Sequence, residues 1–230
     1  MDALLLLVRT LHLLFVISWI GRLYWINFAE SPFLLETNIR SRDSTTISWW
    51  RWSPLGVVVT GFVYLLVKRL QIGSWQFLDG SYGVFMLTGA ALGLVMAANL
   101  WLVMRPLKRK VKAAAAGLGP VEAARAAAEN LQRLGFATRT NTLFSLPVIF
   151  LMGAAPHYVV RPWEGLGWRP AALCGVLAAA VVAALEFNGL VGHAGFGKRL
   201  LESRAAVAVS AVVFGTVLFV LAKLMAGAGL

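Results

Sequence analysis

Cysteine and charged residues are scarce in this 230-residue chain. With one cysteine, Cys174, the chain can form no internal disulfide, no cysteine-rich zinc cluster and no CxxCH haem-attachment site. Charged residues make up 13% of the chain, well below the roughly one quarter that is usual for soluble domains. Hydrophobic residues make up 59%. These proportions exclude an ordinary soluble protein and indicate an integral membrane protein.

Acidic residues are especially few. The 21 Lys and Arg residues outnumber the 10 Asp and Glu residues, which gives a net charge of +11. The positive charges flank apolar runs instead of gathering in one patch, a pattern typical of the loops of a membrane protein. We therefore expect a lipid bilayer as the surroundings of this chain, and no nucleic acid as a partner.

Apolar runs recur along the chain, and a helix of about 20 residues crosses the roughly 30 Å hydrocarbon core of a bilayer. The runs predict an all-α fold, a polytopic bundle of about six transmembrane helices that forms a single transmembrane domain over residues 1–230. Arg9 and His12 interrupt the first run, so we expect a retained first helix and no cleaved signal peptide. The expected spans are residues 3–28, 54–70, 82–104, 139–158, 170–191 and 205–225.

The longest hydrophilic stretch, residues 105–138, connects the third and fourth expected spans. It is rich in alanine and in Lys and Arg, with only Glu122 and Glu129 as acidic residues. This composition predicts a basic amphipathic connector whose helices lie along the membrane surface. Because the most basic loop of a membrane protein lies in the cytoplasm, we expect a multi-pass membrane protein whose two termini both lie on the opposite, outer side of the membrane.

The chain has three histidines, which are its main candidates for chemistry. In the expected topology, His12 of the first span and His157 at the end of the fourth both approach the outer surface, whereas His193 lies toward the inner one. Two neutral imidazoles from different helices can hold a b-type haem as axial ligands. Interfacial histidines that hydrogen-bond to water are the alternative, and spacing alone leaves both interpretations open.

Other polar residues inside the expected spans have two interpretations. Asn99, Asn141 and Ser145 are expected to hydrogen-bond between helices. Glu186 is either an acid that handles protons or binds a quinone, or an interfacial acid that pairs with Arg22 or Arg139. Besides the two histidines, the secondary candidates for a functional site are Trp19, Arg139, Asn141, Tyr158 and Glu186.

Four segments of this chain resemble segments of a known protein family and follow one another in the same order. The stretch LFSLPVIFLMGAAPHY, residues 143–158, resembles the "TLPVLF…SNHYP" segment of the membrane domain at the N-terminus of a bacterial urate oxidase family. HLLFVISWIGRLYWINF, residues 12–28, is similar to its "H…WIG…YF" helix. WWRWSPLGVVVTGF and GLVMAANLWLVMRPLKRKV are similar to the start of its second span and the end of its third. The ordered series extends from about residue 11 to residue 190.

The resemblance implies a role in redox chemistry. Members of that family are membrane proteins that often end in a cytochrome c domain, and the family is associated with urate oxidation that passes electrons to the respiratory chain. The resemblance thus implies that His12 and His157 are functional, as ligands of haem b. The family pattern also has a histidine where this chain has Thr140, and another just before Phe187 that this chain lacks.

These features predict an inner-membrane electron-transfer subunit that binds one b-type haem through His12 and His157. Its expected partners are a cytochrome c or subunits of a respiratory complex, and an oligomer is possible through the small residues on its helix faces. One alternative is a urate-type oxidoreductase that works with a separate cytochrome c. Another is a cofactor-free structural subunit of a membrane complex.

The predicted orientation can be tested by cysteine labelling. In a Cys174→Ser background, Ala114→Cys should react with a membrane-impermeant thiol reagent only when the cytoplasmic face is accessible, because the basic connector should be cytoplasmic. Labelling of intact cells from the periplasmic side would overturn the whole orientation.

Overall fold

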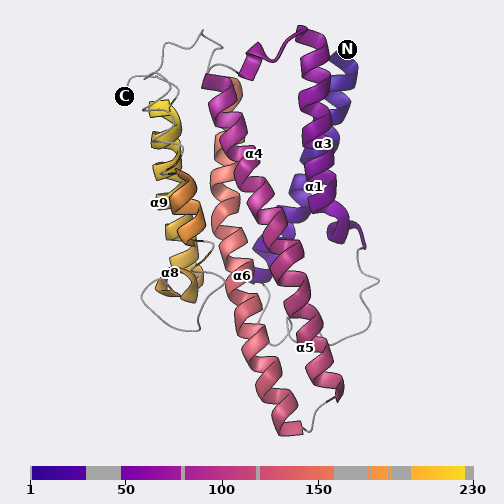
Figure 1. The fold of residues 1–230 in the computed structure, drawn as a ribbon, viewed down its shortest axis with the longest axis vertical. Helices are drawn as coiled ribbons and strands as arrows, with labels where there is room; N and C mark the ends of the chain where they lie inside the picture. The colour runs from indigo at the N-terminus through magenta and orange to yellow at the C-terminus, as the bar shows by residue number, and fades with distance from the viewer. Residues whose placement is uncertain are drawn as a thin grey trace.

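The computed structural model describes residues 2–29, 48–78, 81–117, 120–157, 176, 178–185, 187 and 198–225. Every regular element in these ranges is helical, which confirms the predicted all-α class (Figure 1). The elements are α1 (Asp2–Tyr24), η1 (Trp25–Ala29), α3 (Ser48–Ile72), η2 (Gln76–Leu78), α4 (Ser81–Asn99), η3 (Leu100–Met104), α5 (Arg105–Gly117), α6 (Pro120–Ala154), η4 (Ala155–His157), α8 (Arg199–Glu202) and α9 (Arg204–Met225).

Several helices are suited to a bilayer. Within the described ranges, four stretches are long and apolar enough to cross a membrane: Asp2–Ala29, Trp52–Ile72, Ser81–Val111 and Arg204–Leu224. They agree with the first, second, third and sixth expected spans. The fourth expected span coincides with the second half of α6, and most of the fifth lies outside the described residues. These stretches support a membrane protein. The predicted number of six transmembrane helices stays a prediction.

The helices pack as neighbouring pairs. Helix α1 lies against α3, whereas α6 packs against both α4 and α9. The start of α1 and the end of α9 lie at one end of the bundle, opposite the end of α5 and the start of α6 (Figure 1). The expected topology likewise places both ends of the chain on the side opposite the basic connector.

Aromatic rings fill the core between α4, α6 and α9. Phe144 of α6 and Phe214 of α9 are buried, with ring centroids 5.5 Å apart. Phe85 of α4 contacts Phe219 of α9 at the same separation. Large apolar side chains on the outer faces remain exposed, for example Ile17 at 67% and Phe62 at 62%. This distribution is the one expected when lipid replaces water around the bundle.

The small residues of α4 have different neighbours. A Cβ atom at Gly89 would lie 2.8 Å from the Met152 side chain of α6, so this glycine permits close packing inside the bundle. A Cβ atom at Gly93 would meet nothing within 4 Å among the described residues. Part of the small-residue face of α4 therefore packs against α6 within the chain and is not available for contact with another subunit.

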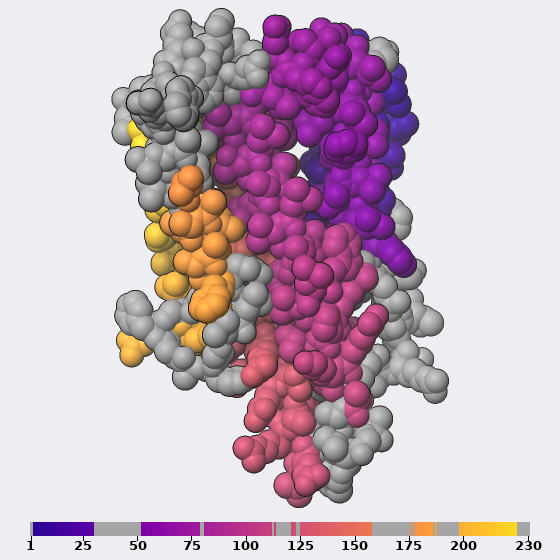
Figure 2. Space-filling model, viewed as in Figure 1, coloured from indigo at the N-terminus to yellow at the C-terminus, as the bar shows by residue number. Residues whose placement is uncertain are grey.

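The connector differs from the expected surface-lying helices. It is helical, but α5 continues α4 through η3, and α5 and the first half of α6 form a hairpin that projects beyond the bundle (Figures 1 and 2). Leu100, Met104, Leu107 and Val111 recur at intervals of three and four residues and pack against Leu134 and Ala137 of α6. This apolar stripe needs a partner helix, and α6 provides it.

The contact between α1 and α3 can be tested at one glycine. A Cβ atom at Gly56 would lie 2.5 Å from the ring of Phe15, so Gly56→Leu should force the two helices apart and lower the free energy of unfolding by about 1–3 kcal/mol. Gly93→Leu is the matched control and should change it by less than about 0.5 kcal/mol. Thermal unfolding in detergent measures both, and equal effects would refute the close contact.

Candidate functional site

His12 of α1 is half-buried and faces α3. Its Nδ1 atom lies 3.0 Å from the Thr60 hydroxyl oxygen, and that hydroxyl donates its proton to the carbonyl oxygen of Gly56. The Thr60 oxygen must therefore accept a hydrogen bond from the Nδ1–H group of His12. This arrangement assigns the tautomer and leaves the lone pair on Nε2. A histidine held in this way is prepared to bind a metal through Nε2.

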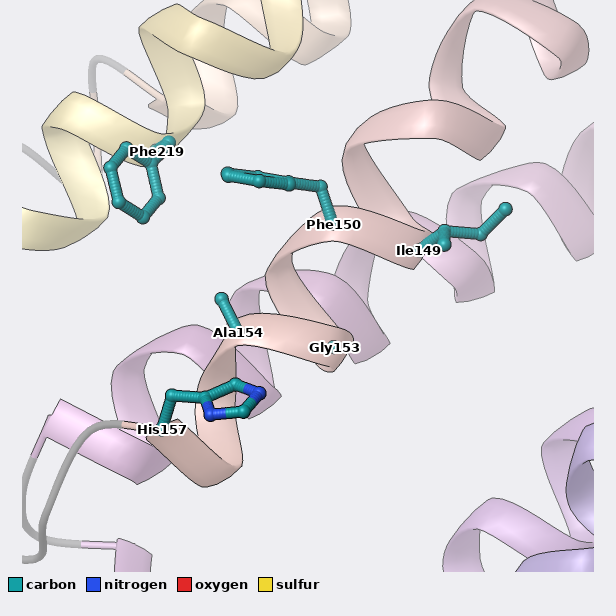
Figure 3. Close-up of a pocket in the computed structure, with 6 residues that line it drawn as sticks. All are labelled: Ile149, Phe150, Gly153, Ala154, His157 and Phe219. Atoms are coloured by element: carbon teal, nitrogen blue, oxygen red, sulfur yellow. The ribbon is translucent and has the colours of Figure 1, made fainter.

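His157 lies in η4, just beyond α6, and is exposed. It borders an open groove of about 450 Å³ between α6 and α9, whose other lining residues are apolar (Figure 3). Figure 3 shows Phe150 directed toward Phe219 of α9, and their ring centroids are 5.1 Å apart. A Cβ atom at Gly153 would meet nothing within 4 Å among the described residues, so the groove stays open one helical turn before the imidazole. The lining residues are Ile149, Phe150, Gly153, Ala154, His157 and Phe219.

The structure does not bring the two histidines into one pocket. His12 lies against Thr60 and Gly61 of α3, whereas the groove beside His157 is formed by α6 and α9. Each imidazole is thus a candidate ligand in its own surroundings. Their pairing on one haem stays a prediction.

A buried polar segment in the middle of α6 contacts the end of α4. The Asn99 side-chain amide donates to Asn141 Oδ1 at 2.9 Å and to the Ala137 carbonyl oxygen at 3.3 Å. Asn141 in turn donates to the carbonyl oxygen of Met96 at 3.0 Å. The predicted hydrogen bonds of Asn99 and Asn141 between helices are confirmed.

The same segment of α6 is bonded from its other side by α1 and η1. Asn27 donates to the Thr142 hydroxyl oxygen at 2.8 Å, and the Thr138 hydroxyl donates to Asn27 Oδ1 at 3.3 Å. Ser145 lies 3.1 Å from the Tyr24 hydroxyl, which confirms its predicted contact between helices. We name residues 138–145 of α6 the polar segment.

Both contacts involve a π-helical turn. Asn27 lies within η1, and Asn99 directly precedes η3. Such wide turns arise from an inserted residue and are frequent at functional sites. Here each turn accompanies an asparagine that reaches the polar segment, so both irregular turns contribute to the position of α6.

Arg139 lines a second cavity, which lies beside the polar segment. Its Nη1 atom donates to the carbonyl oxygens of Leu201 and Glu202, at 2.7 and 3.0 Å, at the end of α8. The side chain borders a cavity of about 510 Å³ between η1, α6, the end of α8 and the start of α9. Nearby, Lys198 is buried with its Nζ atom 4.6 Å from the ring centre of Phe136, and burial lowers the pKa of Lys198.

The other predicted site residues lie apart or outside the described ranges. Trp19 is buried, and its indole N–H group has no hydrogen-bond acceptor among the described residues. Tyr158 and Glu186 lie outside the described residues, as do His193 and Cys174. The proposed roles of these four residues therefore stay predictions.

Two contributors to these sites were not anticipated from the sequence. Thr60 assigns the tautomer of His12, and Asn27 bonds the polar segment. Each is a polar residue in a largely apolar helix, and such residues tend to have partners in a membrane. A polar residue in an apolar helix thus indicates that a partner exists, but it does not identify the helix on which that partner lies.

Comparison with known proteins gives one match. The family model described as urate oxidase N-terminal matches residues 52–220. The matched region contains Thr60, the polar segment and His157, whereas His12 precedes it. No curated protein and no solved structure matches the chain.

The contact between α4 and α6 can be tested by a double-mutant cycle. Asn99→Ala and Asn141→Ala should each lower the free energy of unfolding by about 1–2 kcal/mol, because each leaves a buried amide without its partner. The double variant should lose clearly less than the sum, because both substitutions remove the same hydrogen bond. Asn130→Ala is the control, since Asn130 bonds only within its own helix, to Ala126. Strictly additive losses in detergent unfolding would contradict the coupling.

Proposed function

We propose, since this chain belongs to the urate oxidase N-terminal family, that it is an electron-transfer subunit of the bacterial inner membrane. In this proposal His12 and His157 are the axial ligands of one b-type haem. The subunit exchanges electrons with a separate cytochrome c or with a respiratory complex. Both termini lie in the periplasm, so the haem is near the outer surface, where a periplasmic electron carrier can approach.

The surroundings of His12 are the observation that carries this proposal. Its Nδ1–H group is bonded to Thr60, so the lone pair of Nε2 is available to a metal. Gly61 leaves room for the ring, because a Cβ atom there would lie 3.1 Å from His12 Cε1. The same hydrogen bond orients the imidazole ring against α3.

The groove beside His157 also fits a hydrophobic metal-bearing group. It is apolar apart from the imidazole, and Gly153 keeps it open at the level of the preceding turn. Two imidazole ligands leave haem iron no open position for a substrate, so the chemistry they support is the transfer of single electrons. The part of this chain is then to hold the haem through the two imidazoles and to line it with apolar side chains, among them Phe150 and Phe219.

The description of the matched family favours a second candidate. A urate oxidase N-terminal domain belongs, by that description, to an enzyme that oxidises urate. This chain would then act on urate together with a separate cytochrome c. Urate turnover by the purified chain with an added cytochrome c distinguishes this candidate from a subunit that only transfers electrons.

The haem ligands can be tested by absorption spectroscopy. Either His12→Ala or His157→Ala should abolish the reduced-minus-oxidised spectrum of a low-spin b haem, because loss of one ligand leaves the iron five-coordinate. Gly153→Leu should weaken haem binding by filling the groove, and Gly93→Leu, at an equally open glycine of α4, should not.

His193→Ala serves as the histidine control and should keep the wild-type spectrum. A well-folded wild type without haem would sink the proposal and favour a structural subunit. Loss of the spectrum in His193→Ala alone would instead refute the choice of ligands.

A further inference from the structure

The cavity beside Arg139 has features of a binding site that the haem proposal does not use. It lies where α1 and η1 end and α9 begins, on the side of the bundle from which the basic α5–α6 hairpin projects (Figure 1). The polar residues that line it are Asn27, Gln132, Thr138, Arg139, Glu202 and Arg204. The remaining described lining comes from apolar side chains and backbone of η1 and α6.

The charge of this lining is positive. Among the described lining residues, Arg139 and Arg204 are positively charged and Glu202 is negatively charged, which leaves one net positive charge. Both guanidinium groups line the same cavity. Guanidinium groups bind the oxygens of phosphates and carboxylates in bidentate fashion.

Hydrogen-bond donors in the cavity divide into used and available groups. Asn27 and Thr138 are bonded to each other and to α6, so they shape the wall without offering donors. Arg139 uses Nη1 on two carbonyl oxygens at the end of α8, and its Nε–H and Nη2–H₂ groups are additional donors. The Gln132 side-chain amide is a further donor on the same helix, about two turns before Arg139.

The start of α9 strengthens the attraction for an anion. Arg204 is the first residue of this 22-residue helix, and the Ser203 hydroxyl caps the Ala206 N–H group at 3.0 Å. The aligned peptide dipoles place a partial positive charge at the same end. The cavity thus combines two arginines, an amide and the positive end of a long helix.

We propose that this cavity binds a phosphate group. A phosphate presents several oxygens at once, which matches donors that come from two helices better than a single carboxylate does. The phosphate is either the headgroup of an anionic phospholipid or a free phosphate, since both present the same oxygens. The site is separate from the histidines and does not depend on the proposed haem.

The full chain in a neutral detergent is the material for the test. Three probes are titrated while the melting temperature is followed: short-chain phosphatidic acid, the diacylglycerol with the same chains, and inorganic phosphate. Phosphatidic acid should raise the melting temperature in a saturable way, and diacylglycerol should not. An effect of inorganic phosphate as well would show that a free phosphate suffices, whereas an effect of the lipid alone would identify a headgroup site. No saturable effect of either phosphate probe would overturn the proposal.

Matched variants locate the binding. Gln132→Glu adds a carboxylate inside the cavity and should weaken the affinity for phosphatidic acid at least about tenfold, because it replaces an amide donor with a negative charge. Asn130→Asp adds the same charge to the same helix outside the cavity and should leave the affinity within about twofold. Equal losses in the two variants would attribute the binding to overall surface charge and refute the site.

Arg204→Gln provides a second, independent variant. It removes one guanidinium from the cavity and should also weaken binding at least about tenfold. Arg139 is left unchanged in this test because it also bonds the end of α8, so its removal would mix folding with binding. Unaltered affinity in a folded Arg204→Gln protein would contradict the proposed role of the arginine pair.

Discussion

The need to satisfy polar groups within apolar surroundings determines where α6 lies. Asn141 and its neighbours in the polar segment are buried, and an unpaired amide or hydroxyl in such surroundings costs several kcal/mol. Asn99 provides a hydrogen-bond partner from α4, and Asn27 provides one from η1, the turn that follows α1. Two hydrogen-bonding asparagines on opposite sides hold one helix in a single rotation and a single depth, which apolar packing alone would not specify.

The position of α6 in turn places both candidate sites. At about 1.5 Å per residue its 35 residues extend for roughly 50 Å, well beyond the hydrocarbon core of a bilayer. The helix therefore carries the groove of His157 at one end of the bundle and the cavity of Arg139 toward the other. Between them, Pro147 packs beside Gly215 of α9, where a Cβ atom would lie 3.6 Å from the proline ring.

Composition predicted the helices better than their contacts. Long apolar runs indicate spans because no other structure satisfies the backbone in lipid, and most of the expected spans coincide with helices. The partners of Thr60 and Asn27 could not be predicted, since they depend on how neighbouring helices are rotated. The packing of the connector could not be predicted for a related reason: its charges indicate contact with water, whereas the stripe from Leu100 to Val111 directs α5 onto α6.

The functional claim is that His12 and His157 hold one haem, although the structure gives them separate surroundings. His12 has an assigned tautomer against α3, and His157 lies at the edge of an apolar groove on α6. Electron paramagnetic resonance of the oxidised, purified protein tests this claim most directly, because it reports the spin state of ferric haem. The account predicts a low-spin signal, as expected for two imidazole ligands. A high-spin signal, or no haem signal from folded protein, would contradict it.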